Sequence, residues 1–156
     1  MLPEPAPDND YHAPHLPLLL DSFHTLTGRH LLPPDPDPVE TARLLYHAPF
    51  FLASHDTAPD PLFTYGNLTA QRLFEMTWDQ FTQTPSRFTA EAPNRAERAS
   101  LLQRVTTHGF IDDYSGIRIS STGQRFRITQ ATVWNLRDPH GQLLGQAASF
   151  QNWQRV

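Results

Sequence analysis

Residues 113–153 read DYSGIRISSTGQRFRITQATVWNLRDPHGQLLGQAASFQNW, in which three strand-like runs are separated by two turns. The runs span residues 113–120, 124–136 and 142–153, and the turns are Ser121-Thr122-Gly123 and Asp138-Pro139-His140-Gly141. Short connections of this composition are typical of hairpins between neighbouring antiparallel strands. The stretch therefore predicts a three-stranded antiparallel meander.

The region before this meander is helical in character. Its longest predicted helix is capped by Asn94 and ends near Gly109, since apolar residues recur between them at helical spacing. Asn67 and Thr77 are suited to cap two shorter helices. Two short strands are predicted further upstream, over residues 50–54 and 62–65.

The first 48 residues divide into a tail and a helical extension. Residues 1–14 are rich in proline and acidic residues and lack periodicity, which predicts a disordered tail. Residues 15–48 contain an apolar stripe from Leu16 to Leu26, with Gly28 as a stop, and a second short helix from Val39 to His47. Residues 49–156 then form the main domain.

Composition restricts the class of protein. A chain of 156 residues with 38% apolar content supports one domain with a real core. The absence of cysteine excludes disulfides, thiolate nucleophiles and a cysteine-adduct flavin photosensor. The net charge of -4 predicts no direct binding of nucleic acid. No signal peptide and no apolar run of about 20 residues is present, so a cytoplasmic protein that does not enter the membrane is expected.

The order of the predicted elements is two strands, several helices and three strands, which is the order of the PAS fold. We predict an α+β, PAS-like architecture with an antiparallel five-stranded sheet, helices on one face and two extra N-terminal helices. The alternative is a cone-shaped α+β barrel similar to ketosteroid isomerase. The two strands placed before the main helices favour the PAS-like arrangement.

The central run of the meander has a period close to two, so its side chains alternate between two faces. The face expected to meet the core carries Phe126, Ile128, Gln130, Thr132 and Trp134, because it holds both large aromatic residues. A buried amide or hydroxyl without a partner costs about 1–3 kcal/mol. Gln130 and Thr132 therefore need a partner in the protein, a water molecule or a ligand.

A small-molecule pocket is an aromatic shell with a few polar groups inside it. The sequence offers such a set, although bulky apolar residues are more often plain core. The candidate pocket residues are Phe51, Phe74, Met76, Trp78, Gln130, Thr132, Trp134 and Gln146.

Three groups of titratable residues favour structural roles over chemistry. His55-Asp56 is a lone dipeptide in a loop, and Asp112-Asp113 lies at a junction where aspartates satisfy backbone donors. Haem-binding PAS domains use a histidine on the long helix, but His108 lies at the end of its predicted helix, next to Gly109. We expect no catalytic residues, no metal site and no haem, and the cofactor is unknown.

Clustered motifs over most of the chain resemble the MEKHLA-domain family. The resemblance extends from about Leu18 to Trp153 and is carried by LFEMTW (73–78), PSR (85–87), GFIDDY (109–114), GIRISSTG (116–123), RFRI (125–128), ATVWNL (131–136) and GQAA (145–148). It implies a PAS-like fold, a bacterial protein, and kinship with the regulatory C-terminal domain of plant class III homeodomain-leucine-zipper factors. The family defines no catalytic residues.

We therefore predict a non-catalytic sensory or regulatory domain that binds a small molecule, mediates dimerisation or protein interaction, or both. A homodimer through the N-terminal helix and the sheet is expected, because an amphipathic helix needs an apolar partner surface. The alternative function is a small cone-shaped enzyme that uses an Asp/His pair.

Overall fold

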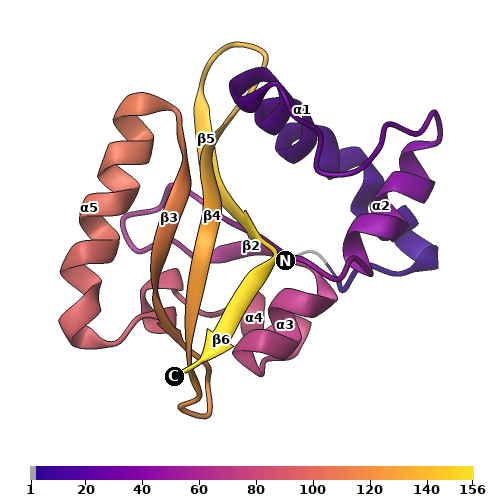
Figure 1. Ribbon diagram of the computed structural model, residues 1–156. Helices are drawn as coiled ribbons and strands as arrows, with labels where there is room; N and C mark the ends of the chain where they lie inside the picture. The colour runs from indigo at the N-terminus through magenta and orange to yellow at the C-terminus, as the bar shows by residue number, and fades with distance from the viewer. Residues whose placement is uncertain (1–2) are drawn as a thin grey trace.

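The computed structural model describes residues 3–156, with the side chains of residues 92–94 left out of the description. Six antiparallel strands form one sheet at the centre of the molecule (Figure 1). They are β1 (Phe51–His55), β2 (Phe63–Gly66), β3 (Phe110–Ile119), β4 (Arg125–Arg137), β5 (Leu143–Phe150) and β6 (Asn152–Arg155). The sheet order is β2-β1-β5-β4-β3, and β6 pairs with β4. The predicted α+β fold is confirmed, with one additional short strand.

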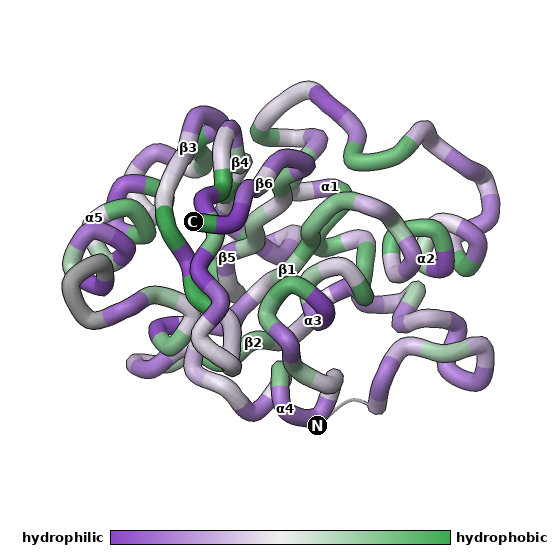
Figure 2. Tube along the Cα trace, turned by 60° about the horizontal axis from the view of Figure 1, so that its bottom comes forward, coloured by the Kyte–Doolittle hydropathy of each residue, from purple (hydrophilic) through white to green (hydrophobic). Residues whose placement is uncertain are grey.

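The α-helices lie where the capping residues and apolar spacing predict them, and two 3₁₀ helices that were not predicted are added. The helices are η1 (Pro7–His15), α1 (Leu16–Thr27), α2 (Pro38–Tyr46), α3 (Leu68–Phe74), α4 (Trp78–Thr82), η2 (Ser86–Thr89) and α5 (Ala92–His108). Asn67 and Thr77 cap α3 and α4 as expected. The longest helix begins two residues before the predicted cap Asn94, with Glu91 in the N-cap position. Figure 2 shows α5 as a mixture of hydrophilic and hydrophobic residues, as expected of a helix with one buried side.

Two hydrophobic clusters cover opposite faces of the sheet. One cluster joins α1 and α2 to Leu52, Trp134 and Leu136, and the other joins α3, α4 and α5 to Phe51 and Val133. Successive residues of β1 therefore belong to different clusters, which explains why Phe51 to Ser54 are all buried. The sheet is covered on both faces, by the N-terminal helices on one side and the main helices on the other.

The N-terminal helix packs on the sheet of its own chain. Leu16, Leu19 and Phe23 of α1 are buried in the same cluster as Trp134, and the rings of Phe23 and Trp134 meet edge to face with centroids 4.9 Å apart. The prediction of a homodimer through this helix stays a prediction. No helix of residues 3–156 combines the length and the apolar character needed to cross a bilayer.

The first residues also lie against the domain. η1 contacts α2, with His12 and Ala13 buried, and the Tyr46 hydroxyl lies 2.7 Å from a carboxylate oxygen of Glu4. This arrangement differs from the disordered tail expected for residues 1–14, of which residues 1–2 lie outside the described range.

Strand β4 does not keep one side chain face along its whole length. Phe126 and Ala131 belong to the same cluster, although a regular strand would place them on opposite faces. Between them Gln130 has a φ of 52°, and the pairing with β3 shifts register on both sides of Tyr114. Residues 129–130 therefore form a β-bulge, which adds one residue and reverses the direction of every later side chain.

This bulge overturns the predicted core face of the central strand. Gln130 is exposed, Phe126 and Ile128 point toward α3 and α5, and Trp134 points toward α1. The neighbouring strands are irregular at the same level: the register of β3 shifts beyond Ile111, and Gln151 interrupts the run of β5 into β6. Three strands thus change face together, and the run predicted for residues 142–153 is divided into β5 and β6.

Two substitutions of Gln130 distinguish a bulge from a regular strand, because the two structures predict opposite orders of stability for the glycine and valine variants. Gln130→Gly should leave the free energy of unfolding unchanged or raise it by up to about 1 kcal/mol, because glycine adopts positive φ without strain. Gln130→Val should lower it by about 1–2 kcal/mol, because a β-branched residue is strained there. Urea unfolding measures both variants. Valine more stable than glycine, the order of a regular strand, would contradict the bulge.

Candidate functional site

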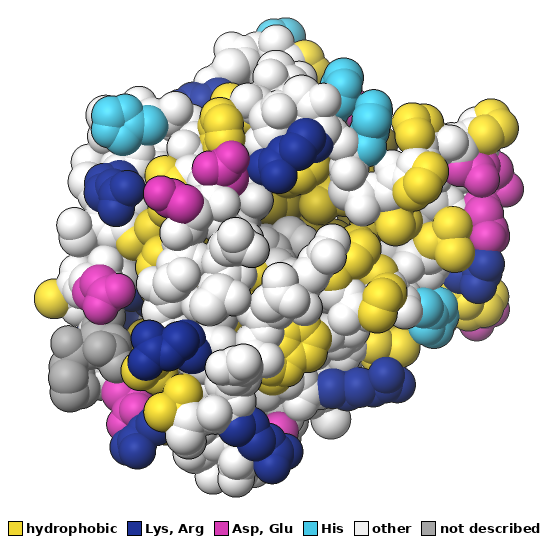
Figure 3. Space-filling view, viewed as in Figure 1, with side chains coloured by type: hydrophobic (Ala, Val, Ile, Leu, Met, Phe, Trp, Pro, Cys, Tyr) yellow, Lys and Arg dark blue, Asp and Glu magenta, His cyan; other side chains and the backbone are white. Residues whose placement is uncertain are grey.

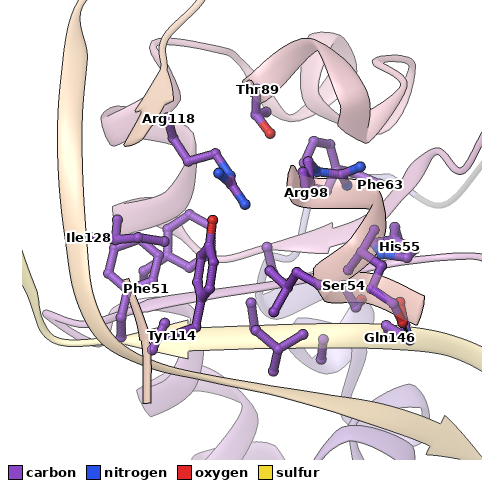
Figure 4. A pocket seen from close by; sticks show the side chains of 18 of the residues that line it. Phe51, Ser54, His55, Phe63, Thr89, Arg98, Tyr114, Arg118, Ile128 and Gln146 are labelled. Atoms are coloured by element: carbon purple, nitrogen blue, oxygen red, sulfur yellow. Dashed lines mark hydrogen bonds between the residues drawn. The ribbon is translucent and has the colours of Figure 1, made fainter. Parts of the chain in front are cut away.

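A cavity of about 80 Å³ lies between α5 and the sheet (Figure 4). Strand β1 contributes Phe51, Ala53, Ser54 and His55, and all of β2–β5, α3, α5 and η2 contribute further side chains. Most of its wall is apolar, with Phe51 stacked on Phe150 at a centroid distance of 4.3 Å. The remaining groups that face it are polar or charged, namely Ser54, His55, Thr89, Arg98, Tyr114, Arg118 and Gln146.

Strand β3 presents Tyr114 and Arg118 inward. Tyr114, Gly116 and Arg118 are buried, whereas Ile117 and Ile119 on the other face are only half-buried. A strand that only stabilises a core shows the opposite arrangement. Because Tyr114 and Arg118 are more buried than the isoleucines of the same strand, this face of β3 is a candidate binding surface.

Gly116 gives the Tyr114 side chain its position. A Cβ atom on residue 116 would collide with the hydroxyl end of Tyr114, so the tyrosine ring lies along the strand over the glycine. The ring then meets Arg118, whose guanidinium carbon is 5.2 Å from the ring centroid. Figure 4 shows Arg118 and Tyr114 pointing into the same part of the cavity, with Arg98 and Thr89 beside them.

Neither arginine of the cavity has an acidic partner among the described residues. Arg118 is 9% exposed and donates to the carbonyl oxygen of Ile117 at 3.0 Å, and Arg98 donates to the Ser86 hydroxyl at 2.6 Å. Ion pairs within 4.0 Å form elsewhere, and all involve partly exposed arginines. Burial, and secondly the charge of Arg118, lower the pKa of Arg98 to about 10. The site is therefore electropositive and uncompensated.

The Tyr114 hydroxyl is buried without a hydrogen-bond partner in the protein. An unsatisfied buried hydroxyl costs about 1–3 kcal/mol, so such a group in a native structure calls for a water molecule or ligand. It lies at the same cavity as the two arginines. The polar requirements of the cavity therefore point to an acceptor that the chain itself does not supply.

His55 and Asp56 do not form the Asp/His pair of the enzyme alternative. The Nδ1 atom of His55 lies 2.8 Å from the backbone carbonyl oxygen of Asp56 and donates to it. The Asp56 carboxylate accepts instead from the backbone N–H groups of Ala58 and Leu62, which organises the loop. Burial lowers the pKa of His55, which favours a neutral imidazole at this wall of the cavity.

The structure brings only part of the predicted pocket together. Phe51, Phe74 and Gln146 line the cavity. Met76 packs beside the same cluster, while Trp78 and Trp134 belong to the cluster under α1 and α2. Gln130 and Thr132 instead line a separate groove between α1 and the sheet.

Gln146 serves the fold as well as the wall of the cavity. Its Nε2 group donates to the side-chain oxygen of Asn135, its cross-strand partner, at 3.0 Å, and to the Thr106 hydroxyl of α5 at 3.0 Å. Asn135 in turn donates to the Val105 carbonyl oxygen at 3.0 Å. The two amides tie β4 and β5 to the last turns of α5, so the Gln146 amide nitrogen is already engaged.

Several site residues are absent from the sequence-based set. Arg98, Tyr114 and Arg118 are the chief omissions, because charged and phenolic residues in an alternating strand are normally assigned to the solvent face. One signal was available: residues 114–120 alternate regularly, and Gly116 next to Tyr114 indicates a close approach.

The other surface features carry less chemistry. Figure 3 shows the molecule hollowed between α1 and the sheet, where Arg29 forms a 3.7 Å ion pair with Asp112 across a polar groove. His108, the position considered for haem, is exposed and does not line the cavity. Within the described residues, no cluster of three or more histidine or acidic side chains is suited to a metal ion.

Comparison with known proteins agrees with this architecture. The family model described as the MEKHLA domain matches residues 13–155. None of the curated proteins searched matches the chain. Among solved structures, the PAS domain of a protein from Colwellia psychrerythraea has a TM-score of 0.61 at 12% identity, over 75% of this chain and 94% of that one.

Two light-receptor structures have the same fold. An RNA-binding Light-Oxygen-Voltage receptor has a TM-score of 0.60 at 17% identity and covers 76% of this chain with 35% of its own length. The Light-Oxygen-Voltage domain of the blue-light photoreceptor Aureochrome1 has a TM-score of 0.53 at 19% identity, over 82% of this chain and 88% of that one. At these identities the likeness extends to the fold alone.

Proposed function

Since the chain belongs to the MEKHLA-domain family, with a PAS-like fold, we propose that it is a non-catalytic sensory or regulatory domain whose input is a small molecule. The proposed binding site is the cavity between α5 and the sheet. Occupation of this cavity would alter the packing of α5 on β3 and β4, its neighbouring strands. Such a shift in packing is a route by which a bound ligand biases one conformation over another.

One observation carries the proposal: the cavity has an apolar wall, a buried hydroxyl without a hydrogen-bond partner and a buried arginine without an acidic partner among the described residues. Tyr114 is 8% exposed and its hydroxyl is unsatisfied. Arg118 is equally buried and lacks a carboxylate within 4.0 Å. A core built only for stability avoids such groups, whereas small-molecule sites depend on them.

Flavin does not fit this cavity. A flavin analogue is named for one similar Light-Oxygen-Voltage domain, which has a TM-score of 0.56 at 16% identity. Pockets for ligands of that size have volumes of about 300–1,000 Å³. The present cavity is about 80 Å³, and the chain has no cysteine for an adduct. The ligand we propose is therefore much smaller than flavin.

Filling the cavity tests the proposal. Ala131 lies in the cavity wall on β4, so Ala131→Leu should occupy the space and abolish ligand retention, with a melting temperature equal to or above that of the wild type. The measurement is native mass spectrometry of freshly purified protein, together with thermal melting in a panel of short carboxylates, amides and alcohols. Ala96→Leu, on the exposed side of α5, is the matched control and should behave as the wild type.

The expected result is a retained mass or a melting shift in the wild type and the control, but not in Ala131→Leu. A wild type with neither a retained mass nor any shift would contradict a small-molecule function. Equal shifts in the wild type and Ala131→Leu would place binding elsewhere.

A further inference from the structure

The positive charge of the cavity favours a ligand with a negative charge. A guanidinium group has five N–H donors. Arg118 uses one on the Ile117 carbonyl oxygen, and Arg98 uses one on the Ser86 hydroxyl. No acidic side chain among residues 3–156 lies within 4.0 Å of either group. Several donors of each arginine are thus left for another acceptor.

Two arginines at one small cavity repel each other unless an anion lies between them. The charge of Arg118 opposes protonation of Arg98, in addition to the effect of burial. A burial penalty of this kind is normally offset by a carboxylate partner. Since the chain provides none here, a bound anion is the group that would complete the site.

The third polar group has a matching requirement. The Tyr114 hydroxyl is a donor, is buried, and has no acceptor in the protein. Tyr114 and Arg118 lie on the same face of β3, four positions apart, with Gly116 midway between them. Planar guanidinium groups bind carboxylates through paired hydrogen bonds, and a phenol donates equally well to a carboxylate oxygen.

The size and the wall of the cavity limit the rest of the ligand. An engineered protein cavity of about 150 Å³ holds benzene, which has six non-hydrogen atoms. The present volume of about 80 Å³ suits roughly three non-hydrogen atoms by the same proportion, close to the size of acetate. Phe51, Ile128 and Phe150 supply an apolar wall, which favours an alkyl group over a fully hydrated inorganic anion.

We propose that the cavity binds a short-chain carboxylate, with its carboxylate group held by Arg98, Arg118 and the Tyr114 hydroxyl and its alkyl group against the phenylalanines. This inference rests on the proposed function and adds the chemical class of the ligand.

A matched ligand series tests the charge. Thermal melting of the wild type in HEPES at constant ionic strength is measured with acetate, propionate and butyrate, each against its uncharged amide. Nitrate and phosphate serve as inorganic anions. The carboxylates should raise the melting temperature in a saturable way, with acetate or propionate best, and the amides should not.

Variants then assign the binding groups. Arg98→Gln and Arg118→Gln should each weaken carboxylate binding by about 10- to 100-fold, the usual effect of losing a charge-assisted hydrogen bond. Arg104→Gln removes the same charge from an exposed position of α5 and should bind as the wild type. Tyr114→Phe gives a pair of opposite effects: a higher melting temperature without ligand, since the unsatisfied hydroxyl is gone, and a smaller shift with it.

The outcomes separate the inference from the proposed function. Amides as effective as carboxylates, or nitrate as effective as propionate, would overturn the carboxylate assignment while a small-molecule site stands. The same holds if Arg104→Gln weakens binding as much as Arg98→Gln and Arg118→Gln do. If no member of the series shifts the melting temperature, the inference is overturned, and native mass spectrometry of the purified protein decides whether the proposed function survives.

Discussion

Replacing Asn67 with alanine should lower the free energy of unfolding by about 3–5 kcal/mol, a large effect for a polar side chain. Asn67 is 0% exposed and its amide makes four hydrogen bonds. The Nδ2 group donates to the carbonyl oxygens of Leu45 and Phe50, at 3.1 and 2.8 Å. The Oδ1 atom accepts from the backbone N–H groups of Leu52 and Ala70, at 3.2 and 3.0 Å.

This one side chain joins the end of α2, the start of β1 and the first turn of α3. Alanine would leave three buried backbone groups without their partner, since the Leu45 carbonyl oxygen also accepts from the Ala48 N–H, and each such group costs about 1–3 kcal/mol before the structure relaxes. The hydrogen bonds of one side chain are not independent, so the total loss of stability is smaller than the sum of the separate costs. Urea unfolding monitored by circular dichroism gives the difference between the variant and the wild type.

The matched control is Thr77→Ala. Thr77 is also an N-cap, and its hydroxyl accepts from the backbone N–H of Gln80 at 3.2 Å, but it is exposed. Loss of an exposed cap costs about 1 kcal/mol. Asn67→Asp keeps the accepting oxygen but places a second carboxylate oxygen against the carbonyl oxygens of Leu45 and Phe50, so at neutral pH its loss of stability should equal or exceed that of Asn67→Ala. Equal losses for Asn67→Ala and Thr77→Ala would show that the buried network contributes no more than a cap.

Asn67 also shows what the sequence can and cannot reveal. Its capping role follows from its place before an apolar helical segment, and this prediction is confirmed. The two bonds that it donates reach residues 17 and 22 positions away, and no local pattern encodes them. The hairpin turns are a second local prediction that is confirmed, since Gly123 and Gly141 have the positive φ values, 91° and 82°, that such turns require.

The side chain faces of the sheet were less predictable, because an alternating pattern reads correctly only while the strand stays regular. One extra residue at Gln130 moved Trp134 to the opposite face from Phe126, and with it part of the predicted pocket. Arg118 was missed for a related reason. Hydrophobicity alone assigns Ile117 and Ile119 to the interior, whereas the site requires the charged residue there.

Deleting residues 1–30 should make the protein associate into larger particles in solution, because it would uncover the part of the apolar sheet face that α1 covers. In the structure α1 covers Trp134 and Leu136, which are 0% and 3% exposed. Exposed apolar surface of this kind associates with other copies or leads to aggregation. Size-exclusion chromatography with light scattering measures the number of copies, and a red shift of tryptophan emission reports the exposure of this cluster, which contains Trp78 and Trp134.

Phe23→Ala provides the graded form of the same test in the full chain. Phe23 is 5% exposed and contacts the Trp134 ring, so truncation should lower the free energy of unfolding by about 3–4 kcal/mol. Thr25→Ala, on the exposed side of α1, should change it by less than about 0.5 kcal/mol. A truncated protein with fewer copies per particle than the wild type would instead indicate that α1 joins two copies. An unchanged number of copies together with unchanged stability would mean that the helix contributes little to the core that contains Trp134.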